Sequence, residues 1–69
     1  MSTYAVIYEP GSDGSWSGRA ADLPVYAVGD TREEAERELR SAIAVYLEHL
    51  AEAGRPVPAG LSTVGTVTV

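Results

Sequence analysis

Residues 21–35 read ADLPVYAVGDTREEA and join a short strand to the start of a helix. Thr31 and Glu34 fit a capping box, in which the threonine hydroxyl accepts a hydrogen bond from the third helical amide and the glutamate reaches back to the threonine amide. Pro24 breaks the strand that precedes this stretch, because proline cannot donate to a central ladder. The pattern therefore predicts a strand over residues 25–28 and a helix that begins after Thr31.

The helix predicted after Thr31 carries one apolar stripe. Its members recur at three- and four-residue steps and are Ala35, Leu39, Ala42, Ile43, Tyr46, Leu47 and Leu50. Glu36 and Arg40 form an i,i+4 pair on the polar side, which stabilises a helix by about 0.2–0.5 kcal/mol. Gly54 suits the position just after the helix, where a left-handed backbone is common.

Three further segments have the composition of strands or turns. Residues 3–9 are rich in β-branched and aromatic side chains and predict a first strand. The turn formers of residues 10–14, followed by residues 15–20, predict a hairpin. After the helix, residues 61–69 are again strand-like. The predicted fold class is α+β, with a three-stranded antiparallel meander, one long amphipathic helix and a further C-terminal strand, in the order βββαβ and in one domain over residues 1–69.

The size of the chain favours self-association. A chain of 69 residues buries only about 60% of the surface that its unfolded form exposes. It has no cysteine, so neither a disulfide nor a thiolate zinc site can reinforce the core. One helix can cover only one face of the sheet, and the strand over residues 3–9 is apolar on both sides. We therefore expect a homo-oligomer, either a dimer or a tetramer.

The charge balance bears on partners. Ten carboxylates against five arginines and no lysine give a net charge of −5. Such a chain is a poor match to a nucleic-acid backbone and would attract a basic protein instead. The alternative is that the carboxylates only keep the protein soluble. There is no apolar run of roughly 20 residues and no signal-peptide pattern, so we expect a cytoplasmic protein without a membrane segment.

The order of the motifs resembles that of the HicB-like antitoxins. The motifs are YAVIYE at residues 4–9, GSW at 14–16, ADLP at 21–24, GDTREEA at 29–35 and YLEHLAEAGRPVP at 46–58. Together they cover about residues 3–58. The resemblance implies a partial RNase H-like fold. It also implies a domain that binds a small basic toxin, HicA, which cleaves mRNA, and that masks the active surface of this toxin.

Two features depart from that family. The family typically reads P-D-L-P-G, whereas Ala21 precedes Asp22 here and Val25 stands where glycine is usual. Because valine does not easily adopt a positive φ, the turn after Pro24 must differ or must not need one. Many members also carry a C-terminal DNA-binding segment, and no basic segment remains here for that task. We therefore do not expect direct DNA binding by this chain.

The sequence predicts no catalytic residue, no cofactor and no metal site, and therefore no enzyme. The carboxylates that could hold the metals of an RNase H-like nuclease are Glu9, Asp13, Asp22 and Asp30. Their positions are those of ordinary turn and rim residues. His49 has no cysteine or second histidine to complete a zinc site or a catalytic triad.

The predicted partner-binding residues are Trp16, Asp22, Leu23 and Tyr26. Aromatic side chains beside a polar rim are favoured binding anchors, and Asp22 could pair with an arginine or lysine of a basic toxin. Core or dimer packing of the two aromatic residues, and acceptance of turn amides by Asp22, are the structural alternatives.

Three hypotheses of function follow. The first is an antitoxin-like protein-binding module that neutralises a HicA-type toxin through the surface around Trp16, Asp22 and Tyr26. The second is a homo-oligomeric structural or interaction protein with no toxin partner. The third, a metal-dependent nuclease, predicts cleavage that disappears when Asp22 is replaced by asparagine.

Overall fold

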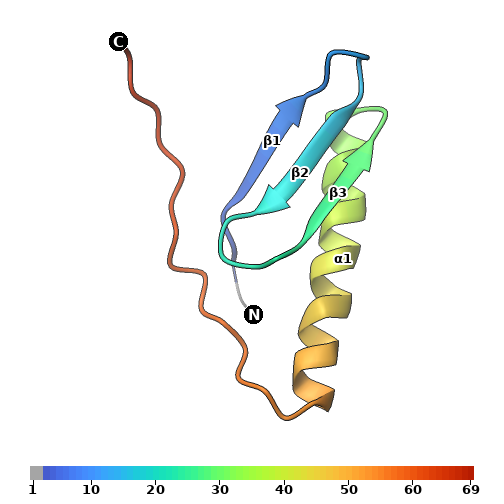
Figure 1. Cartoon of the computed structure of the whole chain (residues 1–69), viewed down its shortest axis with the longest axis vertical. Helices are drawn as coiled ribbons and strands as arrows, with labels where there is room; N and C mark the ends of the chain where they lie inside the picture. Colours follow the sequence, from blue (N-terminus) through green and yellow to red (C-terminus); the bar gives the residue numbers. More distant parts are fainter. Residues whose placement is uncertain (1–2) are drawn as a thin grey trace.

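The computed structural model describes residues 3–69 and contains four elements in the order βββα (Figure 1). The elements are β1 (Val6–Pro10), β2 (Trp16–Ala20), β3 (Tyr26–Gly29) and α1 (Arg32–Glu52). The strands form one antiparallel sheet in the order β1-β2-β3, and α1 lies across one face of it (Figure 1). The predicted α+β class and the three-stranded meander are confirmed.

The register of the sheet determines which side chains face the helix. Gly18 on β2 pairs with Tyr8 on β1 and with Ala27 on β3. A Cβ atom at Gly18 would lie 3.1 Å from Cδ2 of Leu39, so this row of residues faces α1. Because successive side chains of a strand point to opposite faces, Arg19 and its partners lie on the open face.

The junction between β3 and α1 is tight. A Cβ atom at Gly29 would lie only 2.6 Å from the backbone nitrogen of Ala35, so the strand can approach the helix this closely only without a side chain. Thr31 is extended at φ −131° and ψ 163°, and its Oγ1 accepts a hydrogen bond from the Glu34 amide at 3.1 Å. The predicted N-cap is confirmed. The reciprocal bond from the Glu34 side chain is not formed within residues 3–69.

The helix ends as the sequence predicts. Gly54 has φ +67°, its amide donates to the Ala51 carbonyl at 3.1 Å, and the Arg55 amide donates to the Leu50 carbonyl at 2.9 Å. These two bonds are those of a Schellman motif, in which the residue after the C-cap takes the left-handed conformation. In the described part of the chain, no helix combines the length and the apolar character that a membrane crossing requires.

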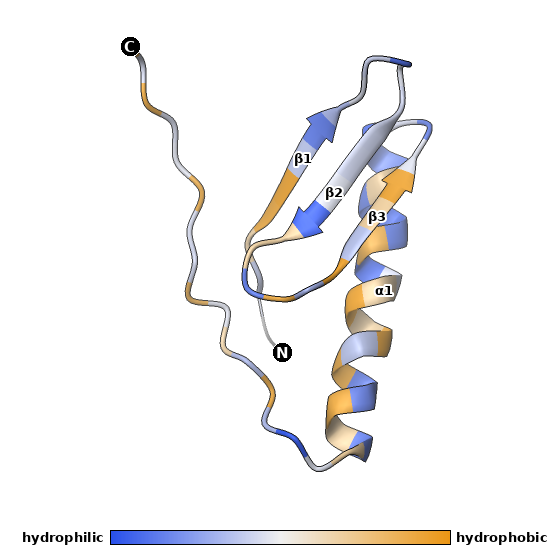
Figure 2. Cartoon of the chain, in the orientation of Figure 1, coloured by the Kyte–Doolittle hydropathy of each residue, from blue (hydrophilic) through white to orange (hydrophobic). Residues whose placement is uncertain are grey.

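The core is small because α1 is longer than the sheet that it covers. The buried apolar residues are Ala20, Leu23, Ala35, Leu39 and Leu50. The remaining members of the helix stripe, such as Ile43 and Leu47, are only half-buried. Hydrophobic residues continue along α1 beyond the end of the sheet (Figure 2). The single chain therefore leaves part of its apolar surface open.

Residues 55–69 leave the helix in an extended form. The Tyr4 hydroxyl donates to the Pro58 carbonyl at 2.9 Å, and the Ser62 amide donates to Oδ2 of Asp22 at 3.0 Å. Beyond Ser62 the chain stands clear of the sheet (Figure 1). Residues 61–69 therefore form no strand of the observed sheet, unlike the prediction, because a strand needs a ladder partner and none reaches them within residues 3–69.

The cap gives a first prediction. Replacing Thr31 with alanine removes the acceptor of the Glu34 amide and should lower the free energy of unfolding by about 1 kcal/mol. For a domain of this size that corresponds to a fall in Tm of about 4–8 °C. Thr31→Ser keeps the acceptor and serves as the control. Thermal unfolding followed by circular dichroism measures both, and equal stability of the two variants would contradict the cap.

Candidate binding surface

The four predicted partner-binding residues do not form one surface. Leu23 is only 5% exposed and belongs to the core. Trp16 shares a strand face with Gly18, toward the helix, and is half-buried. Tyr26 lies on the opposite, open face and is 75% exposed. Asp22 lies in the turn between β2 and β3. The structure thus leaves Tyr26 as the predicted anchor that is available to a partner.

The turn before β3 accommodates Val25, which stands at the position where the HicB-like antitoxins typically have glycine. The Val25 amide donates to the Leu23 carbonyl at 2.8 Å, which closes a three-residue turn centred on Pro24. The Val25 carbonyl accepts from the Ala20 amide at 3.0 Å and so continues the sheet. No non-glycine residue among residues 3–69 has a positive φ. Val25 therefore occupies this turn without backbone strain.

Asp22 binds the C-terminal segment of its own chain. Its carboxylate accepts a hydrogen bond from the Ser62 amide at 3.0 Å and another from the Ser62 hydroxyl. These two bonds hold the pKa of the Asp22 carboxyl below its ordinary value, because both favour the charged form. The predicted role as an acceptor of turn amides is replaced by a contact across 40 residues of sequence.

The open sheet face consists of two rows of side chains across the three strands. The rows are Ile7, Arg19 and Tyr26, and then Glu9, Ser17 and Val28. Tyr26 is 75% and Val28 57% exposed. These two residues place an aromatic ring and an aliphatic side chain next to each other on the outer strand β3. Exposed apolar side chains of this kind on a sheet face are typical of a contact surface.

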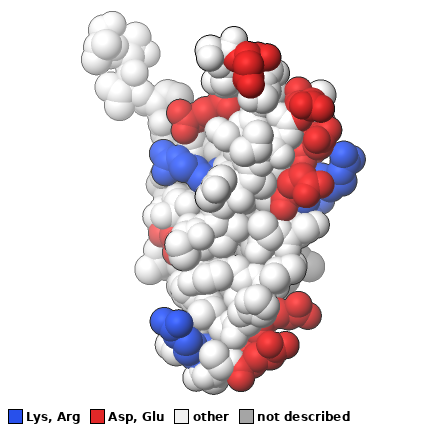
Figure 3. All heavy atoms as spheres, turned by 45° about the vertical axis from the view of Figure 1, so that its right-hand side comes forward, with Lys and Arg blue, Asp and Glu red and all other residues white. Residues whose placement is uncertain are grey.

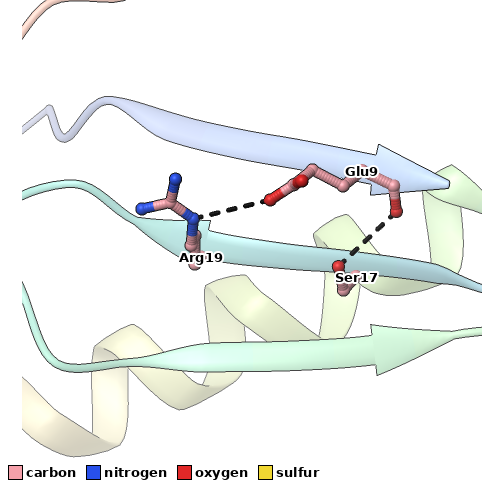
Figure 4. A network of polar contacts seen from close by, with 3 residues as sticks. All are labelled: Glu9, Ser17 and Arg19. Carbon is pink, nitrogen blue, oxygen red and sulfur yellow. Dashed lines mark hydrogen bonds and ion pairs between the residues drawn. The ribbon is translucent and has the colours of Figure 1, made fainter. Parts of the chain in front are cut away.

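A polar network occupies the other side of the open sheet face. Nε of Arg19 lies 3.6 Å from Oε1 of Glu9, and the Ser17 hydroxyl donates to the Glu9 backbone carbonyl at 3.5 Å (Figure 4). Both charged side chains are largely exposed, so this pair contributes little to stability, about 0–1 kcal/mol. Its more important effect is that the open sheet face carries no net charge.

Other carboxylates lie around this face of zero net charge. Asp30, Glu33 and Glu34 gather at the start of α1. In the view toward β3 and α1, acidic side chains lie toward both ends of the molecule and leave an uncharged band between them (Figure 3). A negative charge distribution of this kind attracts positively charged molecules over a long range.

The candidate metal ligands are each engaged in local contacts or stand apart. Glu9 pairs with Arg19, and Asp22 with Ser62. Asp13 accepts from the Ser15 amide at 3.1 Å and from the Ser15 hydroxyl at 2.6 Å, and these bonds lower its pKa. Within residues 3–69, no three His, Asp or Glu side chains lie close enough together to hold a metal ion.

Comparisons of the chain with protein-family models, with curated proteins and with solved structures gave no match.

The hydrogen bonds of Asp22 predict a pH dependence. Because its folded pKa is lowered, the contact with Ser62 is fully present above the ordinary aspartate value of about 3.9 and is lost as the pH falls through the lower, folded value. The Ser62 amide, followed by NMR, should shift with a midpoint below that ordinary value. A midpoint at or above it would contradict the contact.

The matched variants are Asp22→Asn and Asp13→Asn. The first should abolish the titration of the Ser62 amide, since no carboxylate remains to be protonated. The second removes another carboxylate of lowered pKa and should leave the Ser62 titration unchanged.

Proposed function

We propose that this chain is a protein-binding module of the HicB-like antitoxin type, which binds a small basic HicA-like toxin and masks its active surface. The observation that carries the proposal is the exposed pair Tyr26 and Val28 on an outer strand of a chain with net charge −5. An acidic protein that presents uncharged apolar side chains suits a basic partner, because charge guides the encounter and apolar contact supplies affinity.

The free edge of β3 adds a second mode of contact to the same site. The Ala20 amide donates to the carbonyl of Val25, the residue just before β3. By alternation, Ala27 and Gly29 also direct their backbone N–H and C=O groups toward β2, whereas the backbone groups of Tyr26 and Val28 point toward the outer edge of the sheet. A partner strand could pair with this edge and contact the two side chains at the same time.

The resemblance supplies the identity of the partner. The βββα order over residues 6–52 is the arrangement that the resemblance requires for this part of the chain. The RNase H-like relation, the C-terminal strand, the cytoplasmic location and the absence of direct DNA binding by this chain belong to the same proposal. The module acts by occlusion and carries out no chemistry of its own.

A second candidate is a homo-oligomeric interaction protein with no toxin partner. The specific observation that favours it is the unpaired segment over residues 61–69, whose larger apolar side chains are exposed.

Binding to a small basic protein encoded beside this chain tests the first candidate. The two proteins should co-elute in size-exclusion chromatography at micromolar concentration, and the mixture should lose the ribonuclease activity of the basic protein. The variant Tyr26→Ala/Val28→Ala should bind at least about 10-fold more weakly, because hot-spot side chains contribute more than about 1 kcal/mol each.

Val45→Ala is the matched control, since Val45 is 49% exposed but lies on α1, away from the open sheet face. This variant should bind the basic protein as tightly as the wild-type chain does. Separate elution of the two proteins, absence of such a neighbouring gene, or equal weakening by the control would exclude this function and leave the second candidate.

A further inference from the structure

The segment of residues 61–69 exposes its apolar side chains almost completely. Leu61 is 84%, Val64 62% and Val67 88% exposed, and Val69 is fully exposed. A Cβ atom at Gly65 would meet no other atom within 4 Å. An extended, apolar segment without a ladder partner is unstable in water and readily pairs with another strand.

The pattern of the segment is that of a strand buried on one side. Leu61, Val67 and Val69 fall on one face together with Thr63 and Gly65. Ser62, Thr66 and Thr68 fall on the other face, where Val64 is the exception. The segment is rich in β-branched residues, and its alternation predicts one face toward a core and one toward solvent.

A free strand edge is present on β1. The Ala21 amide donates to the Ala5 carbonyl at 3.0 Å, so the backbone groups of Ala5, and by alternation those of Ile7, point toward β2. The backbone groups of Val6 and Tyr8 therefore point away from the sheet. Within residues 3–69 no strand pairs with them.

A hollow of about 350 Å³ lies beside the same edge, between β1 and α1. Its apolar lining includes Val6, Leu39 and Ile43. It exists because α1 lies mainly over β2 and β3 and covers the helix-facing side of β1 only in part (Figure 1). A fourth strand beside β1 would direct every second side chain toward this hollow.

Three of the polar residues that line the hollow, Tyr8, Glu36 and Arg40, have partners within the chain. The Tyr8 hydroxyl donates to Oε1 of Glu36 at 3.3 Å, and Nη2 of Arg40 lies 3.9 Å from Oε2 of Glu36. The Arg32 guanidinium lies over the Tyr8 ring, 4.3 Å from its centre. Burial and the Glu36 carboxylate raise the pKa of Tyr8, which therefore remains a donor at neutral pH. The hollow is thus suited to apolar side chains.

The anchors of the segment direct it away from its own sheet. Gly60 packs so closely against the Thr3 carbonyl that a side chain would not fit there, and Ser62 is bound by Asp22. From this point residues 63–69 run clear of the sheet (Figure 1). At about 3.3 Å per residue these seven residues reach roughly 23 Å, which is enough to lie along a whole strand of another molecule.

The distribution of charge along the chain favours a second copy of this protein as the binding partner of the β1 edge. All ten carboxylates and all five arginines lie at or before residue 55, so residues 56–69 carry no charged side chain. Two molecules of net charge −5 repel each other elsewhere, but this segment can approach another copy without repulsion. It also offers no carboxylate to a basic partner. Donor strand and acceptor edge are both present in one chain, so two copies can satisfy each other reciprocally.

We propose that residues 61–69 of each copy add as a fourth strand to the β1 edge of a second copy and close the hollow between its β1 and α1. Two chains exchange this strand and form a symmetric dimer. The β3 edge stays free in this dimer, so the exchange does not depend on the proposed toxin partner.

Light scattering coupled to size-exclusion chromatography tests the exchange. The chain at micromolar concentration should have twice the mass of one molecule. Val67→Asp places a charge on the face toward the hollow and should give a monomer of unchanged helix content. Thr66→Asp places the same charge on the opposite face and should remain a dimer. The proposal would be overturned if the wild-type chain were a monomer, or if both substitutions lowered the measured mass to the same extent.

Crosslinking locates the acceptor edge, because the chain contains no cysteine of its own. A Thr66→Cys chain is refolded together with an isotope-labelled Ile7→Cys chain and treated with a short bismaleimide, because both positions would lie on the open face of the extended sheet. Each chain then has one cysteine, so a product that joins Thr66→Cys to Ile7→Cys must link two molecules. We expect this product in higher yield than the one formed with a Val28→Cys chain on β3. The reverse order of yields, or no mixed product, would overturn the assignment to β1.

Discussion

The close approach of β3 to the first turn of α1 is the constraint on which the rest of the structure depends. Gly29 has no side chain and meets the helix backbone at Ala35, while Thr31 caps the helix immediately after the strand. The helix must therefore begin directly against β3. Gly18 extends this contact, because the missing side chain makes room for Leu39 over the middle strand. Two glycines thus determine where α1 lies.

The placement of the helix decides which surfaces remain open. Because α1 covers β3 and β2 closely, the helix-facing side of β1 is left with a hollow, and the far end of the apolar stripe extends past the sheet. Within residues 3–69, no segment covers the other sheet face. This part of the short, disulfide-free chain thus has a small core, two strand edges without a partner and an uncovered face. We propose a basic partner for the β3 side and a second copy for the β1 side, and the absence of charged side chains after residue 55 distinguishes the two proposals.

The sequence predicted the elements better than it predicted the surface. The capping threonine, the terminal glycine and the spacing of apolar residues are local signals, and the helix follows them closely. The candidate surface failed to assemble as predicted because Trp16 and Tyr26 are both strand aromatics, yet they face opposite sides of the sheet. The role of Val28 and the pairing of Glu9 with Arg19 were missed for the same reason, since only the register shows which residues share a face.

The sequence by itself determined the order of strands, turns and helix, because hydrogen-bonding caps, glycines and apolar periodicity act within a few residues of one another. Only the tertiary structure decided that Leu23 is buried, that Asp22 binds Ser62, and that residues 61–69 pair with no strand among residues 3–69. These outcomes depend on contacts between segments far apart in the chain. Residues 22–26 therefore contribute one exposed aromatic side chain, Tyr26, to the candidate surface. Asp22 in the same stretch binds Ser62, at the start of the segment that we propose to pair with a second molecule.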